Sequence, residues 1–99
     1  ASRALAVRIL QEGGTDPKAR LNWVWRQVLA RAPRADELKT MQTLLVKQLS
    51  EYRNDPAAAQ ALLKVGLQSV PKDINQTELA AWTNLARVIL NLHETITRS

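Results

Sequence analysis

The chain has 99 residues and a mass of 11.1 kDa, a length that allows one domain with one core. Hydrophobic residues make up 45% and charged residues 23%, a composition that excludes a generally disordered chain. The absence of cysteine and the single histidine exclude disulfides, thiol catalysis and paired-histidine metal sites. No apolar run approaches the length of a membrane-spanning helix. We therefore expect residues 1–99 to form a single domain.

Apolar residues recur at helical spacing along nearly the whole chain, which predicts an all-α fold of five helices. The first helix should run from Ser2 to Gln11 and end at Gly13–Gly14, because glycine accepts the left-handed conformation that closes a helix. The second should be capped by Thr15 or Asp16, occupy Pro17–Arg31 and be stopped by Pro33.

The third and fourth helices are separated by the break Asn54-Asp55-Pro56. We expect the third over Ala35–Arg53, with Asp36 and Glu37 in the first turn, where acidic groups complement the helix dipole. The fourth should be capped by Asp55 and cover Pro56–Ser69, followed by a loop over residues 70–74. Its alanine-rich first half allows close approach of a neighbouring helix.

The fifth helix should start at Asn75 or Gln76 and run to Thr97. Its apolar residues cover most of the circumference, so we expect it to be the central helix, packed on several sides. Its polar residues form one strip: Asn84, Arg87, Asn91, Glu94 and Arg98. The strip has two interpretations. Its members stabilise the helix by local pairing, or an otherwise buried helix presents one polar face to a partner.

Catalytic patterns are missing from the sequence. His93 is the sole imidazole and precedes Glu94 directly, so the two point about 100° apart on a helix and cannot form a relay. There is no nucleophile elbow, phosphate-binding loop or zinc-protease motif. We expect no catalytic residue, no cofactor and no metal site in this chain.

The three tryptophans differ in their predicted environments. Trp25 and Trp82 fall in the apolar stripes of their helices and should be core residues. Trp23 lies off the stripe, with Arg20 and Arg26 one turn away on either side. Three interpretations of Trp23 stay open: the rim of the core, the docking site of a neighbouring domain, or a stacking platform for a ligand.

The net charge of +5 and the pI near 10.3 raise the question of a polyanionic partner. The densest basic stretch runs from Lys18 to Lys39 and contains six basic residues. The predicted second and third helices both overlap this stretch. The third starts with Asp36 and Glu37, which would repel phosphate, so we do not expect these two helices to bind DNA in a sequence-specific way. We favour a solvated surface over a nucleic-acid site.

Three segments resemble the closing domain of large planctomycete multidomain proteins. The segment Ala80–Arg98 resembles the A-A-W-T and L-L-N-L-x-E-x-x-T-R motifs of those proteins, and Trp25–Leu38 resembles their F-R-x-x-L-G-R-x-P-x-x-x-E-L motif. The opening Ala4–Leu10 also fits. This chain departs from the pattern at three places: Ala30 replaces glycine, Arg34-Ala35 replaces a Thr-Pro helix start, and His93 replaces aspartate.

The resemblance implies a C-terminal piece of an extracytoplasmic protein that also carries a cytochrome-c-like haem domain. The chain begins with Ala1 rather than methionine, which also suggests a piece of something longer. The haem motif C-x-x-C-H is absent, so haem binding is not implied for these residues.

The expected function is a non-catalytic structural or protein-interaction module. Its partner would be another domain of the parent chain or a separate protein. The candidate contact surface consists of an off-stripe aromatic residue and polar residues on two helices: Trp23, Arg26, Arg87, Asn91 and Arg98. The alternative is a basic domain that binds nucleic acid or another polyanion.

Overall fold

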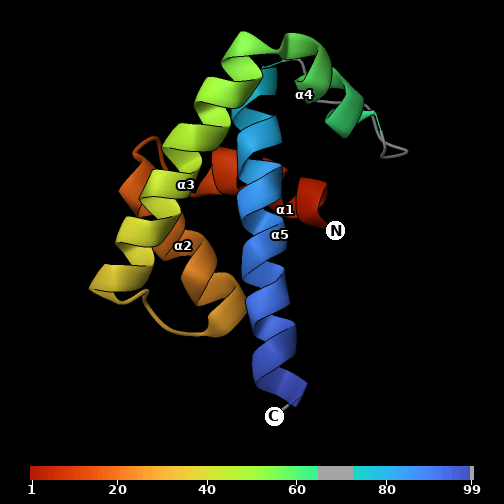
Figure 1. The fold of residues 1–99 in the computed structure, drawn as a ribbon. Coiled ribbons are helices and arrows are strands. Elements are labelled where there is room, and N and C mark those ends of the chain that lie inside the picture. Colours follow the sequence, from red (N-terminus) through yellow and green to blue (C-terminus); the bar gives the residue numbers. More distant parts are fainter. Residues whose placement is uncertain (65–72, 99) are drawn as a thin grey trace.

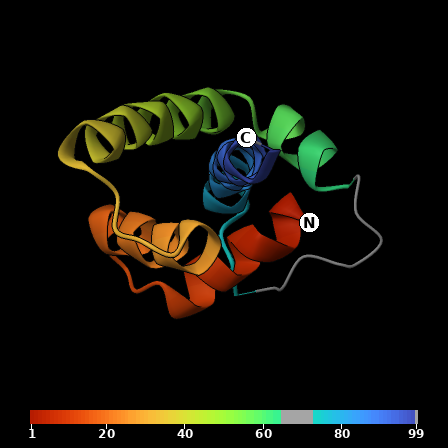
Figure 2. The same cartoon turned by 90° about the horizontal axis from the view of Figure 1, so that it is seen from below.

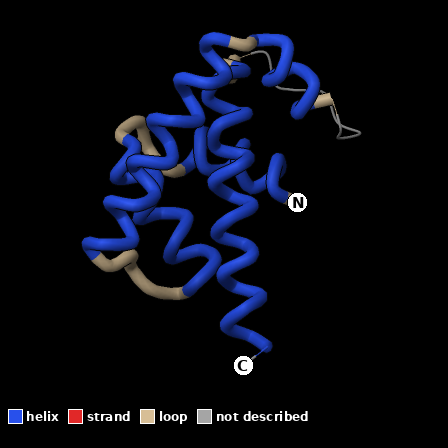
Figure 3. Tube along the Cα trace, in the orientation of Figure 1, coloured by secondary structure: helices blue, strands red, loops and turns tan. Residues whose placement is uncertain are grey.

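The computed structural model describes residues 1–64 and 73–98, with side chains described as far as Thr95. Within these residues the structure contains helices and no strand, which confirms the predicted all-α fold (Figure 3). The helices are α1 (Ser2–Glu12), α2 (Pro17–Leu29), α3 (Ala35–Asn54), α4 (Pro56–Leu63) and α5 (Gln76–Arg98).

Helix α5 is the centre of the bundle and contacts each of the other four helices (Figure 1). Seen end-on, it is surrounded by α1, α2, α3 and α4 (Figure 2). Every residue from Leu79 to Thr83 is buried, as are Leu85, Ala86 and Ile89. The prediction of a central last helix is therefore confirmed for its first half. Trp25 and Trp82 are both 1% exposed, which confirms them as core residues.

Three helix starts have the caps expected from their sequences. The side chains of Asp16, Asp55 and Asn75 each accept the backbone N–H three residues further on, at 3.2, 3.2 and 3.1 Å. Pro17 and Pro56 occupy the first helical positions of α2 and α4, where their missing N–H costs no hydrogen bond. Local sequence thus fixes where α2, α4 and α5 begin.

Helix α2 ends at Leu29, two residues before the predicted end at Arg31. Pro33 is not the cause. Ala30 adopts the left-handed conformation, with φ 60°, and its N–H donates to the Arg26 carbonyl at 3.2 Å. This conformation favours glycine, the residue that the resembling proteins carry at this position.

Helix α4 ends at Leu63, before the predicted end at Ser69. Lys64 lies in a turn, and residues 65–72, which include the rest of the predicted helix and part of the predicted loop, lie outside the described residues. The Leu63 carbonyl at this end accepts a hydrogen bond from Arg3 Nη1 at 2.9 Å. An arginine of α1 therefore donates a hydrogen bond to the last residue of α4 and ties the two helices together.

Helix α3 starts at Ala35, as predicted, although arginine is a poor residue to precede a helix. The Arg34 side chain carries only donors and cannot accept an N–H from the first turn. The Glu37 carboxylate supplies the other half of a capping box by accepting the Arg34 N–H at 2.8 Å. The Arg34-Ala35 departure therefore keeps one of the two hydrogen bonds of a capping box.

Candidate interaction surface

The second half of α5 is exposed. Ile89 is its last buried residue among those whose side chains are described, and residues 91–95 are all exposed. This end of α5 projects below the other helices in Figure 1. Five exposed residues at helical spacing form what we call the exposed strip of α5: Arg87, Val88, Asn91, Leu92 and Thr95.

Two of the predicted contact residues, Arg87 and Asn91, belong to the exposed strip of α5. The Asn91 carbonyl accepts a hydrogen bond from the Thr95 hydroxyl at 3.0 Å, a contact within the helix. The Arg98 side chain lies outside the described residues. Arg87 has no ion pair within the described part of the chain.

Asn84, which the sequence pattern placed on the same polar strip, points to α3 instead. Its Nδ2 donates to Gln48 Oε1 at 2.8 Å and to Tyr52 Oη at 2.6 Å. Asn84 therefore joins two helices, and the interpretation in which the whole strip faces a partner does not hold at this residue. The exposed strip begins one turn later.

The exposed strip also contains two of the apolar residues that cover most of the circumference of the last helix in the sequence pattern. Val88 is 38% exposed and Leu92 is 39% exposed. Each follows a polar strip residue, Arg87 or Asn91, by one position. Because Val88 and Leu92 directly follow polar residues of the strip, the sequence indicated that their side chains lie at the edge of the polar face.

Trp23 lies on α2, at its junction with α1. It is half-buried and packs against the core, as expected for the core rim. The Arg8 guanidinium lies over its ring at 5.3 Å from the centroid, and Arg8 Nε also pairs with Glu12 at 3.1 Å. One side of the indole is therefore covered by α1, which supports the core-rim interpretation over an open stacking platform.

Arg26 lies in the last turn of α2 and is exposed. No ion pair of Arg26 occurs in residues 1–64 and 73–95. Over the same residues, no hydrogen bond, ion pair or cation–π contact links Trp23 or Arg26 to Arg87 or Asn91. The predicted contact residues thus lie on two helices, Trp23 and Arg26 on α2 and Arg87 and Asn91 on α5, and none of those contacts joins the two pairs.

Three of the six basic residues in the Lys18–Lys39 stretch are buried or ion-paired. Arg20 is buried, and both Arg31 and Arg34 pair with Glu37, at 2.8 and 3.7 Å. The hydrogen bond from Arg31 is the largest cause that lowers the pKa of Glu37 to about 2. The pairing with Glu37 lowers the net positive charge of this part of the basic stretch, although the Arg31 and Arg34 side chains stay 43% and 70% exposed.

The described residues contain no group of three or more His, Asp or Glu side chains that could hold a metal ion. None of the helices in the described ranges is sufficiently long and apolar to cross a bilayer. No family model matches the chain, and comparisons with curated proteins and with solved structures give no match. The resemblance to planctomycete proteins therefore stays a prediction.

Proposed function

We propose that this domain is a non-catalytic helical module that binds a protein surface through the exposed strip of α5. The observation that carries the proposal is the exposure of Val88 and Leu92, at 38% and 39%, on a helix whose residues 79–83 are all buried. Two neighbouring exposed apolar side chains with a polar border resemble the centre of a small protein interface.

Charge indicates what the partner surface should carry. Arg87 borders the two apolar residues and has no ion pair in the described part of the chain. The whole chain has a net charge of +5. A partner with an apolar centre and at least one carboxylate opposite Arg87 would therefore be favoured, because complementary charges speed encounter and fix register.

The occupant in this proposal is a neighbouring domain of the parent protein. The resemblance to planctomycete multidomain proteins, which implies neighbouring domains in the same chain, supports this choice. A separate protein with the same surface chemistry is the other candidate occupant, and it would give a crosslink from position 92 to a second polypeptide.

The test is site-specific photo-crosslinking in the full-length parent protein. A photoreactive residue replaces Leu92, and a matched probe replaces Val46, which is 68% exposed on α3, outside the strip. We expect the probe at 92 to crosslink to one defined segment of another domain, and Arg87→Glu to reduce that crosslink at least tenfold. Equal crosslinking from positions 92 and 46, or none from position 92, would overturn the proposal.

Polyanion binding predicts a different result. Retention on heparin or DNA at about 50 mM salt that falls steeply as salt rises, and that Leu92→Ser leaves unchanged, would favour the basic-domain alternative. The pairing of Arg31 and Arg34 with Glu37 is the reason to rank it second.

A further inference from the structure

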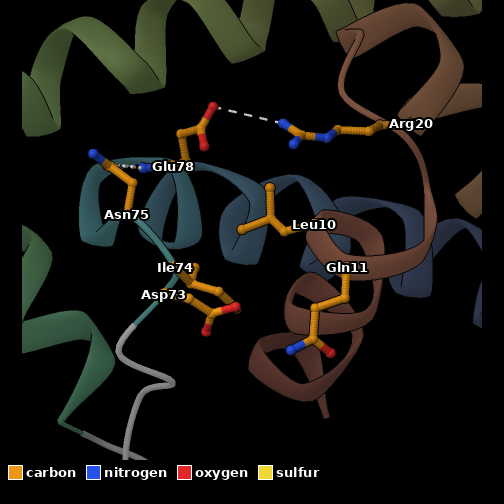
Figure 4. A pocket seen from close by; sticks show the side chains of 7 residues that line it. All are labelled: Leu10, Gln11, Arg20, Asp73, Ile74, Asn75 and Glu78. Carbon is orange, nitrogen blue, oxygen red and sulfur yellow. Dashed lines mark hydrogen bonds and ion pairs between the residues drawn. The ribbon is translucent and has the colours of Figure 1, made fainter.

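Helix α5 is held by its neighbours near its start. Glu78 Oε1, in the first turn, lies 3.6 Å from Nη1 of Arg20, a buried arginine of α2 (Figure 4). Further along the helix, the Asn84 side chain donates hydrogen bonds to Gln48 and Tyr52 of α3. The start of α5 therefore cannot unwind without breaking contacts with two other helices.

The part of α5 after Ile89, which we call the α5 end, has a different environment. Ile89 is the last buried residue among those whose side chains are described, while the helix continues to Arg98. Residues 91–95 are exposed at five consecutive positions, and consecutive positions point about 100° apart, so together they face all sides of the helix. No neighbouring helix therefore buries α5 over residues 91–95, and tertiary packing contributes little to the stability of this part.

The residues of the α5 end also have weak intrinsic helix preferences. Asn91, His93 and Thr95 belong to the poorer helix formers, and Ile96 and Thr97 follow them in the sequence. Asparagine and threonine side chains also compete for backbone hydrogen bonds in non-helical conformations. Growth from an existing helix needs no new nucleus, but residues of this kind propagate a helix poorly. We therefore expect the α5 end to unwind and re-form while the bundle stays folded.

We propose that the α5 end unwinds in the free domain and becomes continuously helical when a partner covers the exposed strip of α5. The second step rests on the proposed function, because Asn91, Leu92 and Thr95 of the strip belong to the α5 end. The partner binds the helical form, which keeps these three side chains on one face. The fraction of domains with a helical α5 end therefore sets the apparent affinity, and helix propensity outside the contact surface becomes a means of regulating binding.

Amide hydrogen exchange of the 99-residue domain tests the unwinding. We expect the amides of residues 93–95 to exchange within about tenfold of the rate of an unstructured peptide, and those of residues 85–89 at least about a thousandfold more slowly. Similar slow exchange in both segments would overturn the proposal. This measurement involves no partner, so its outcome is independent of the proposed function.

A pair of substitutions at His93 tests the unwinding through stability. His93 is exposed and is not part of the exposed strip. His93→Ala and His93→Gly both remove the imidazole, so any contact of that side chain cancels when the two variants are compared. Alanine and glycine differ by about fivefold in helix formation at a fully helical position, and Lys47→Ala and Lys47→Gly, in the exposed interior of α3, should show this difference in urea unfolding. At position 93 the two unfolding constants should agree within about twofold, because the α5 end unwinds before the bundle does. A difference of about fivefold at position 93 would overturn the proposal.

Exchange in the full-length parent protein tests the ordering step. The amides of residues 93–95 should exchange at least about a hundredfold more slowly there than in the 99-residue domain. Equally fast exchange in both, together with the crosslink from position 92, would overturn the ordering step and leave the proposed function intact. Loss of that crosslink, with fast exchange in the domain, would overturn the proposed function and the ordering step with it, and would leave the unwinding supported.

Discussion

The Arg31 guanidinium donates two hydrogen bonds to the Glu37 carboxylate, from Nη1 to Oε1 at 2.8 Å and from Nη2 to Oε2 at 2.9 Å. The same carboxylate accepts the backbone N–H of Arg34 at 2.8 Å. One acidic side chain thus ties the loop after α2 to the first turn of α3. A two-pronged arginine–carboxylate pair is among the stronger ionic contacts in proteins.

This arrangement predicts a dependence of stability on pH. The pKa of Glu37 in the folded chain is about 2, against an ordinary value of 4.5. Between these values the unfolded chain binds more protons, so the stabilisation is fully present above about pH 4.5 and is lost as pH falls through about 2. Urea unfolding at a series of pH values should show Glu37→Gln less stable than the wild type at pH 7, with the difference vanishing near pH 2.

Glu51→Gln is the matched control for this titration, because Glu51 is exposed on the same helix and has no ion pair in the described chain. Its unfolding curves should parallel those of the wild type over the whole pH series. A constant difference between Glu37→Gln and the wild type at every pH would contradict the assigned role of the ion pair.

Ala30 predicts a stabilising substitution. Its φ of 60° is a left-handed conformation that costs a residue with a Cβ atom about 1–2 kcal/mol. Ala30→Gly removes this cost. The greater conformational entropy of glycine in the unfolded chain offsets part of the gain, so we expect a net increase of about 1 kcal/mol in the free energy of unfolding. Ala61→Gly, at an exposed interior position of α4, should instead lose about 0.5–1 kcal/mol. A loss in both variants would show that Ala30 is not strained.

Much of the fold could be predicted from the sequence because its signals are local. The caps Asp16, Asp55 and Asn75 and the buried residues in the first half of α5 depend on spacing along one helix. The end of α2 was missed because Pro33 is a strong signal for a stop, while Ala30 carries no mark of a left-handed residue except the glycine of the resembling proteins.

The candidate sites were harder to predict because they depend on pairs that are distant in sequence. The helical pattern placed Asn84 among exposed polar residues, but α3 brings Gln48 and Tyr52 within hydrogen-bond distance of it. Arg20 looked like one of several surface cations, yet it lies over the Trp82 ring at 6.0 Å from the centroid, a contact between α2 and α5. Helical periodicity predicts on which side of its helix a residue lies, but it does not predict which residue of another helix will contact it.

Gly13 should be intolerant of any side chain although its backbone is not left-handed. A Cβ added there would lie 2.6 Å from the Ile9 carbonyl oxygen and 3.3 Å from Arg20 Cα. Both neighbours are backbone atoms and cannot rotate away, so Gly13→Ala should lower the free energy of unfolding by about 1–3 kcal/mol. Chemical denaturation measures this loss. Wild-type stability in Gly13→Ala would mean that the turn between α1 and α2 relaxes without cost.

The link between α3 and α5 can be tested by a double-mutant cycle on Asn84 and Tyr52. Asn84 Nδ2 donates to Tyr52 Oη at 2.6 Å, and both side chains are half-buried. Asn84→Ala and Tyr52→Phe should each cost about 1 kcal/mol, and the double variant should lose less than their sum by about 0.5–1.5 kcal/mol, because one hydrogen bond is removed only once. Thr43→Ala, which breaks only an exposed bond to the Lys39 carbonyl, is the control partner and should add to Asn84→Ala within about 0.5 kcal/mol. Full additivity of Asn84→Ala and Tyr52→Phe would mean that the hydrogen bond does not hold α5 against α3.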